Sequence, residues 1–109
     1  MSIQNFKVSI DPTRAIGLVR DEENADLVYE EIHDLGENKY IGTLVFEKFF
    51  FRNSNRAALV VIIDNIKGYT DVRSVATGSS QGMIFNFDWG AASEFAGSVR
   101  DILENYIIE

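Results

Sequence analysis

Two consecutive segments carry apolar side chains on both faces of a strand, and this feature limits the possible folds more than any other. The first runs from Tyr40 to Arg52 and the second from Ala57 to Ile66, with the polar turn Arg52–Arg56 between them. Both are rich in β-branched and aromatic residues, which predicts two long strands joined as a hairpin. Neighbouring residues of a strand point to opposite faces, so each segment can be divided by parity.

In both segments each parity set is apolar. In the first segment one set holds Tyr40, Leu44, Phe46 and Phe50, and the other holds Ile41, Val45, Phe49 and Phe51. In the second segment one set holds Ala57, Leu59, Val61 and Ile63, and the other holds Ala58, Val60, Ile62 and Ile66. An antiparallel sheet normally turns one polar face to water. The second face therefore needs a cover: residues 78–90 folding back, a second copy of the chain, or a bound apolar ligand. We favour a second copy, so the sequence predicts a homo-oligomer.

Two helices and three more strands are predicted around this hairpin. Asp11 and Pro12 mark the start of the first helix, which we expect to end near Arg20, because Asp is a good N-cap and Pro at the first helical position loses no hydrogen bond. An apolar stripe at helical spacing predicts the second helix, over Ala92, Phe95, Ala96, Val99, Ile102, Leu103 and Tyr106. Composition and alternation predict strands at Phe6–Ile10, Leu27–Leu35 and Thr70–Thr77, with a turn at residues 36–38.

The resulting fold class is a single α+β domain over residues 1–109, in the order β-α-β-β-β-β-α. This order resembles the TBP-like or helix-grip arrangement, in which a curved antiparallel sheet is packed on a long C-terminal helix. The resemblance implies an alternative to self-association. In that alternative, a small apolar or amphipathic ligand is held between the sheet and the C-terminal helix, near Trp89.

Charge and composition exclude several classes of function. The net charge is −7, and residues 21–37 hold eight of the 17 acidic side chains and no Lys or Arg. A nucleic-acid partner is therefore not expected, and we interpret Lys48, Arg52 and Arg56 beside Phe49–Phe51 as a charged hairpin tip. There is no Cys, residues 1–10 do not resemble a signal peptide, and the longest apolar run is too short to cross a bilayer. We expect a cytoplasmic protein without a membrane partner.

The segment Gly78–Gly90 contains the most suggestive local motif. Gly78-Ser79-Ser80-Gln81-Gly82 matches the G-x-S-x-G nucleophile elbow of hydrolases, but the only His, His33, precedes it and no helix follows at once. We therefore predict no catalytic residue. The Gly-rich turn and the aromatic residues after it instead suggest a ligand pocket or a seal on the core. The candidate ligand-binding residues are Ser79, Ser80, Gln81, Phe85, Phe87 and Trp89.

His33 lies near Glu30, Glu31 and Asp34, a grouping that faintly suggests a metal site. In a strand, Glu31 and His33 share one face while Glu30 and Asp34 share the other. With one imidazole and no calcium-loop spacing, we predict a surface histidine among acids, and neither a metal nor a cofactor.

Three stretches together resemble a small uncharacterised bacterial family, a domain of unknown function. They are Phe46–Ala58, Gly78–Gly82 and Phe85–Gly90. The resemblance implies a bacterial single-domain protein and transfers no activity or catalytic residue. From the residues themselves we expect a non-enzymatic binding or interaction module that self-associates through its second apolar sheet face.

Overall fold

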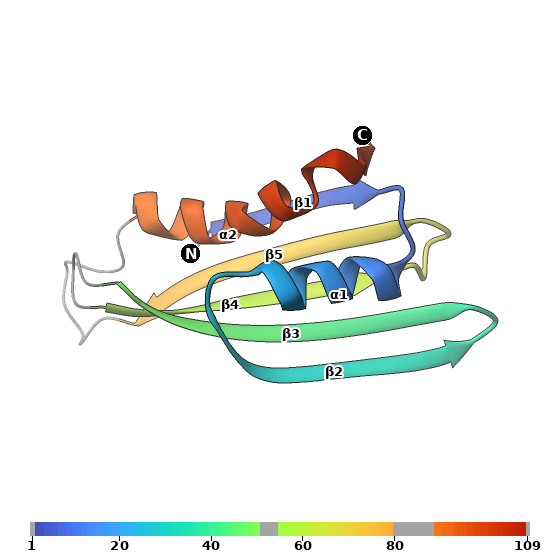
Figure 1. The fold of residues 1–109 in the computed structure, drawn as a ribbon, viewed down its shortest axis with the longest axis horizontal. Helices are drawn as coiled ribbons and strands as arrows, with labels where there is room; N and C mark the ends of the chain where they lie inside the picture. Colours follow the sequence, from blue (N-terminus) through green and yellow to red (C-terminus); the bar gives the residue numbers. More distant parts are fainter. Residues whose placement is uncertain (1, 51–54, 80–88, 109) are drawn as a thin grey trace.

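The computed structural model describes residues 2–50, 55–79 and 89–108, and these form an α+β fold with one antiparallel sheet (Figure 1). The sheet has six strands in the order β2-β3-β4-β5-β1-β6. The strands are β1 (Ser2–Val8), β2 (Asp26–Gly36), β3 (Lys39–Phe50), β4 (Asn55–Asp64), β5 (Thr70–Ser79) and β6 (Ile107–Ile108). The helices are α1 (Pro12–Glu22), α2 (Trp89–Ile102) and the 3-10 turn η2 (Glu104–Tyr106).

Both α-helices lie on the same face of the sheet, which confirms that the helices cover one face only (Figure 1). Helix α1 packs over β3 and β4, and α2 packs over β5 and β1. The core between the layers contains one parity set of the central hairpin, as predicted. Its members on β3 and β4 are at most 2% exposed: Leu44, Phe46, Ala57, Leu59, Val61 and Ile63.

Helix α1 begins as the sequence predicts. The Oδ1 atom of Asp11 accepts a hydrogen bond from the backbone N–H of Arg14 at 3.2 Å, and Pro12 is the first helical residue. The helix continues to Glu22, two residues beyond the expected end at Arg20. The N–H of Glu23 then closes it by donating to the carbonyl oxygen of Val19 at 3.0 Å.

Gly42 explains how closely α1 approaches the sheet. A Cβ atom at this position would collide with Cδ1 of Ile16, and it would lie 3.0 Å from Cγ1 of the same side chain. Ile16 is 1% exposed and has no free space into which to move. Only glycine on β3 therefore allows Ile16 to enter the core from α1.

The prediction for the C-terminal helix was too long. Helix α2 has 14 residues and ends at Ile102, so Leu103 and Tyr106 lie beyond it. After the 3-10 turn the chain pairs with β1, as Ile107 and Ile108 lie opposite Val8 and Lys7. The sheet therefore has a sixth strand that the sequence analysis missed, because two residues are too few to show a period.

Several strand bounds also differ from prediction. Strand β1 covers Ser2–Val8 rather than Phe6–Ile10, and β5 continues to Ser79 rather than Thr77. Strand β4 covers Asn55–Asp64 rather than Ala57–Ile66, which leaves Ile66 51% exposed in a turn. The reason at β4 is Asn65. Its side-chain Oδ1 accepts a hydrogen bond from the backbone N–H of Tyr40 at 2.8 Å, and so replaces the next backbone partner of the ladder. An amide side chain competes with strand pairing in this way.

The turn at residues 36–38 is confirmed. Glu37 and Asn38 have φ angles of 56° and 63°, so both adopt the left-handed conformation that a two-residue type I′ hairpin requires. No helix among the described residues has the length and apolar character needed to cross a membrane.

Candidate interaction surface

The face of the sheet opposite the two helices, called the open face below, carries the second parity set. Strand register gives its members. They are Ile3, Asn5 and Lys7 of β1; Asp26, Tyr29, Glu31 and His33 of β2; Ile41, Thr43, Val45, Glu47 and Phe49 of β3; Arg56, Ala58, Val60, Ile62 and Asp64 of β4; and Asp71, Arg73, Val75 and Thr77 of β5. No helix in the described ranges lies on this face.

One continuous row of apolar side chains crosses the open face. The register pairs Tyr29 with Val45, Val45 with Val60, Val60 with Val75, and Val75 with Ile3. The three valines are half-buried by their neighbours, while Tyr29 and Ile3 at the ends are 51% and 61% exposed. Cross-strand apolar pairs stabilise a sheet, but five in one row also form a surface that water solvates poorly.

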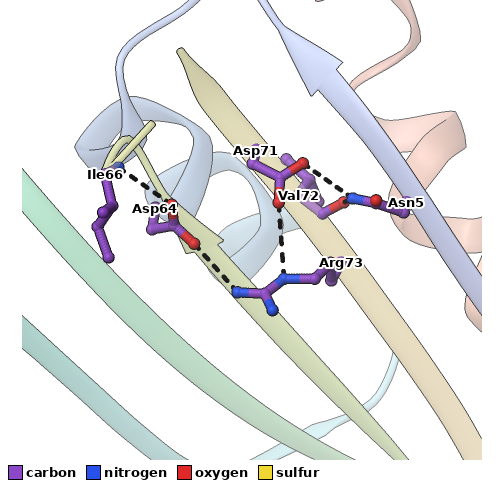
Figure 2. A network of polar contacts seen from close by, with 6 residues as sticks. All are labelled: Asn5, Asp64, Ile66, Asp71, Val72 and Arg73. Carbon is purple, nitrogen blue, oxygen red and sulfur yellow. Dashed lines mark hydrogen bonds and ion pairs between the residues drawn. The ribbon is translucent and has the colours of Figure 1, made fainter. Parts of the chain in front are cut away.

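A polar network borders this row near the ends of β4 and β5 (Figure 2). Arg73 reaches across to Asp64, with Nη2 3.0 Å from Oδ2, and its Nε lies 3.6 Å from Oδ2 of Asp71. Asn5 donates from Nδ2 to Oδ1 of Asp71 at 2.9 Å, and the N–H of Ile66 donates to Oδ1 of Asp64 at 3.1 Å. The carboxylates of Asp64 and Asp71 are buried, at 3% and 4% exposure. Because each is paired with Arg73 and accepts a hydrogen bond, the cost of burying its charge is offset.

Sequence reasoning did not select this network. A usable signal existed for one half of it, because Asp71 and Arg73 are two residues apart on a predicted strand and therefore share a face. The prediction of a strand that continues to Ile66 gave no reason to select Asp64 as part of a polar network.

A second charged cluster lies at the other end of the open face. The Nη1 atom of Arg56 is 3.2 Å from Oε1 of Glu47, and its guanidinium carbon lies 5.9 Å from the centre of the Phe49 ring. Phe49 is 41% exposed. The apolar row thus lies between two charged clusters, an arrangement typical of an interaction surface with a polar rim.

The six candidate ligand-binding residues lie almost entirely outside the described residues. Ser79 is the last residue of β5, opposite Arg56, and Trp89 is the first of α2. The structure describes no side chain for either of them, and Ser80, Gln81, Phe85 and Phe87 lie outside the described ranges. The predicted pocket therefore stays a prediction.

The grouping around His33 is divided as strand alternation predicts. His33 Nε2 lies 3.3 Å from Oε2 of Glu31 on the open face, while Oε2 of Glu30 pairs with Nη1 of Arg20 at 2.8 Å. Over the described ranges no three His, Cys, Asp or Glu side chains gather in a way that could hold a metal ion.

An open acidic pocket of about 200 Å³ lies on the other side of the molecule, between the end of α1, Lys48 of β3 and α2. Its lining includes Glu23, whose pKa is raised mainly because burial penalises the charged form, while Ser98 and Lys48 act in the opposite direction. The Ser98 hydroxyl donates to the Glu23 carboxyl group, with Oγ 2.9 Å from both Glu23 oxygens, and Oγ also lies 2.7 Å from the carbonyl oxygen of Phe95. A hydroxyl has one proton to donate, so these acceptors compete for it and the burial of Glu23 is only partly offset.

Comparison with known proteins identifies one relationship. A model of a family of unknown function (DUF6054) matches residues 16–107, from the middle of α1 to the first residue of β6. No curated protein and no solved structure matches the chain. The match confirms the expected likeness to an uncharacterised family, and it adds no activity, ligand or partner.

Proposed function

The chain belongs to this family of unknown function, DUF6054, and we propose that it is a non-enzymatic interaction module that self-associates through the open face. The observation that carries the proposal is the apolar row from Tyr29 to Ile3 on a face that no described helix covers. Burying such a row against a second sheet removes apolar surface from water, which is the main driving force for association.

The distribution of charge supports a second copy as the partner. The chain as a whole has a net charge of −7. The open face is closer to balance, because its five carboxylates (Asp26, Glu31, Glu47, Asp64 and Asp71) are accompanied by three cations (Lys7, Arg56 and Arg73). Two copies can therefore meet through this face with little of the repulsion that their total charge would otherwise cause.

A two-fold axis running along β4 lets the face pack against itself. Such an axis keeps each cross-strand row in place and exchanges its ends, so that Val60 faces Val60 of the second copy and β3 of one copy lies over β5 of the other. In the apolar row, Val45 of one copy then meets Val75 of the other, and Tyr29 meets Ile3. Every position of this row is thus matched by an apolar one, which favours this register.

The area is sufficient for a modest dimer. Five strands about 4.8 Å apart, over roughly six residues of about 3.4 Å each, give a footprint of roughly 500 Å² per copy. The total of about 1,000 Å² reaches the lower limit for a specific protein interface. We therefore expect a dimer that dissociates on dilution rather than an obligate one.

The direct test is a glutamate at the centre of the row. Position 60 is half-buried in the monomer, so the carboxylate of the Val60→Glu variant can still reach water. In the dimer, two such charges would meet at the axis without a compensating partner. We expect the dimer dissociation constant, measured by sedimentation equilibrium, to rise at least about 100-fold, which corresponds to about 2.8 kcal/mol. The circular dichroism spectrum should not change.

The matched control is Val28→Glu, the same change at a valine that is 56% exposed and lies outside the row. This variant should dimerise like the wild type. The proposal would be contradicted by a wild-type chain that remains monomeric at hundreds of micromolar, or by an equal loss of dimerisation in the two variants.

The helix-grip alternative, a small apolar ligand near Trp89, stays a prediction. Nothing that the structure describes bears on it, because Phe85 and Phe87 lie outside the described residues and so does the Trp89 side chain.

A further inference from the structure

Strand β2 forms one edge of the sheet, and its outer side has no partner within the described residues. It pairs only with β3, and every one of its 11 residues is exposed. Register shifts flank a regular run from Tyr29 to Asp34, so six consecutive residues keep an even ladder. An edge strand presents alternate backbone N–H and C=O groups to its free side, which makes it a template for another strand.

The charges on β2 select what can pair with it. Sheet edges are usually protected by Lys, Pro or inward charges, whereas β2 carries no Lys, Arg or Pro, and besides His33 its ionisable side chains are one Tyr and four acids: Asp26, Glu30, Glu31 and Asp34. Glu30 and Asp34 point to the helix-covered face and Glu31 to the open face, so carboxylates flank the edge on both sides. Arg20 pairs with Glu30 at 2.8 Å, and His33 Nε2 lies 3.3 Å from Glu31 Oε2, so that a Lys or Arg of an added strand would share Glu31 with His33.

A second copy of β2 is a poor occupant of this edge. Antiparallel pairing about a two-fold axis centred on Glu31 sets that residue against itself, and centring on Glu30 does the same there. Centring on Ile32 sets Glu30 against Asp34. Like charges directly opposite one another destabilise a strand pair, so the registers that use most of the run are opposed.

We propose that the edge of β2 accepts an extended basic segment of another protein as an added strand. Backbone hydrogen bonds to the run Tyr29–Asp34 supply the affinity, and Lys or Arg side chains on the open-face side, beside Glu31, supply the selectivity. Apolar residues between the basic ones would lie on the helix-covered side, beside Ile32, which is 45% exposed. Tyr29 belongs to the apolar row as well, but the free backbone groups of the edge point outward in the plane of the sheet and not from the open face, so the proposal does not depend on dimerisation through that face.

The test uses a fluorescein-labelled eight-residue peptide of alternating Lys and Val, with binding followed by fluorescence anisotropy. Two isomers methylated on the backbone nitrogens of either all Lys or all Val residues have the same charge, but each blocks one edge of the peptide. We expect the parent peptide to bind saturably, one isomer to bind at least about tenfold more weakly, and the other to bind like the parent. Absence of parent binding, or equal binding of all three peptides, would overturn the proposal.

Two variants separate recognition at the edge from general attraction. Glu31→Lys should weaken binding of the parent peptide at least about tenfold, whereas Glu104→Lys, the same charge change at an exposed site on η2, should have little effect. Equal weakening by both variants would show that net charge alone attracts the peptide, and the proposal would fail. Val60→Glu should leave peptide binding intact, so failure of dimerisation and failure of edge binding can be told apart.

Discussion

Glu23 is the residue at which burial and hydrogen bonding oppose each other most directly. Desolvation raises the pKa of its carboxyl group above the ordinary value of 4.5, and it outweighs the lowering by Ser98 and Lys48. The native state therefore holds the proton more tightly than the unfolded chain. In the window from 4.5 up to the raised native pKa, the free energy of unfolding falls as pH increases, and the contribution is complete only below that window.

We predict that Glu23→Gln removes this dependence. Glutamine mimics the protonated acid and can still accept a hydrogen bond from Ser98, so the variant should be more stable than the wild type at neutral pH and approach it at acid pH. Urea unfolding at several pH values measures the difference. Glu94→Gln, which removes an exposed carboxylate from the lining of the same pocket, should keep the wild-type slope. If the unfolding free energy of Glu23→Gln depended on pH as it does in the wild type, Glu23 would not be the source of that dependence.

At the scale of elements, Asn65 joins two turns that lie far apart in the sequence. Its Oδ1 accepts from the N–H of Tyr40 at 2.8 Å, and its Nδ2 donates to the carbonyl oxygen of Asn38 at 2.8 Å. The backbone N–H of Asn65 also donates to the carbonyl oxygen of Tyr40 at 3.3 Å. One side chain thus connects the β2–β3 hairpin to the end of β4.

Asn65→Ala should therefore cost about 1–3 kcal/mol of unfolding free energy, because it leaves the N–H of Tyr40 without its partner. The expected site of weakening is the base of the β2–β3 hairpin, which hydrogen exchange at Tyr40 would report. Asn105→Ala, at an exposed position on η2, should stay within about 0.5 kcal/mol of the wild type. A loss no larger than in this control would show that Asn65 does not carry the connection.

At the scale of the whole molecule, the structure is a two-layer arrangement with helices on one face of a sheet, and it measures 47 Å along its longest axis. A sheet with one covered face normally has polar residues on the other. Here the second face carries the apolar row, so the isolated protomer exposes surface that association would remove from water.

Dimerisation through this face makes stability depend on concentration. We expect the melting temperature to rise by about 5 °C when the protein concentration increases a hundredfold, since association stabilises the folded state by mass action. Differential scanning calorimetry over that range measures the shift. In Val60→Glu the melting temperature should not change with concentration, and a wild type that behaves in the same way would argue against the dimer.

Local patterns determined much of this architecture from the sequence alone. Alternation placed Leu44 and Val45 on opposite faces of one strand and Leu59 and Val60 on opposite faces of the next, because a strand has a period of two whatever surrounds it. Asp11 and Pro12 set the start of α1 for an equally local reason, since a helix cap satisfies its own first turn.

Tertiary structure alone decided the features that join distant residues. Gly42 receives Ile16, Asn65 ends β4 at Tyr40, Arg73 bridges Asp64 and Asp71, and Ser98 meets Glu23. Strand β6 likewise exists only because β1 offers it an edge. None of these contacts has a period or a motif in the chain, because each depends on how the helices and strands pack. The apolar second face was thus predictable from alternation, whereas the charged clusters that border it depended on packing.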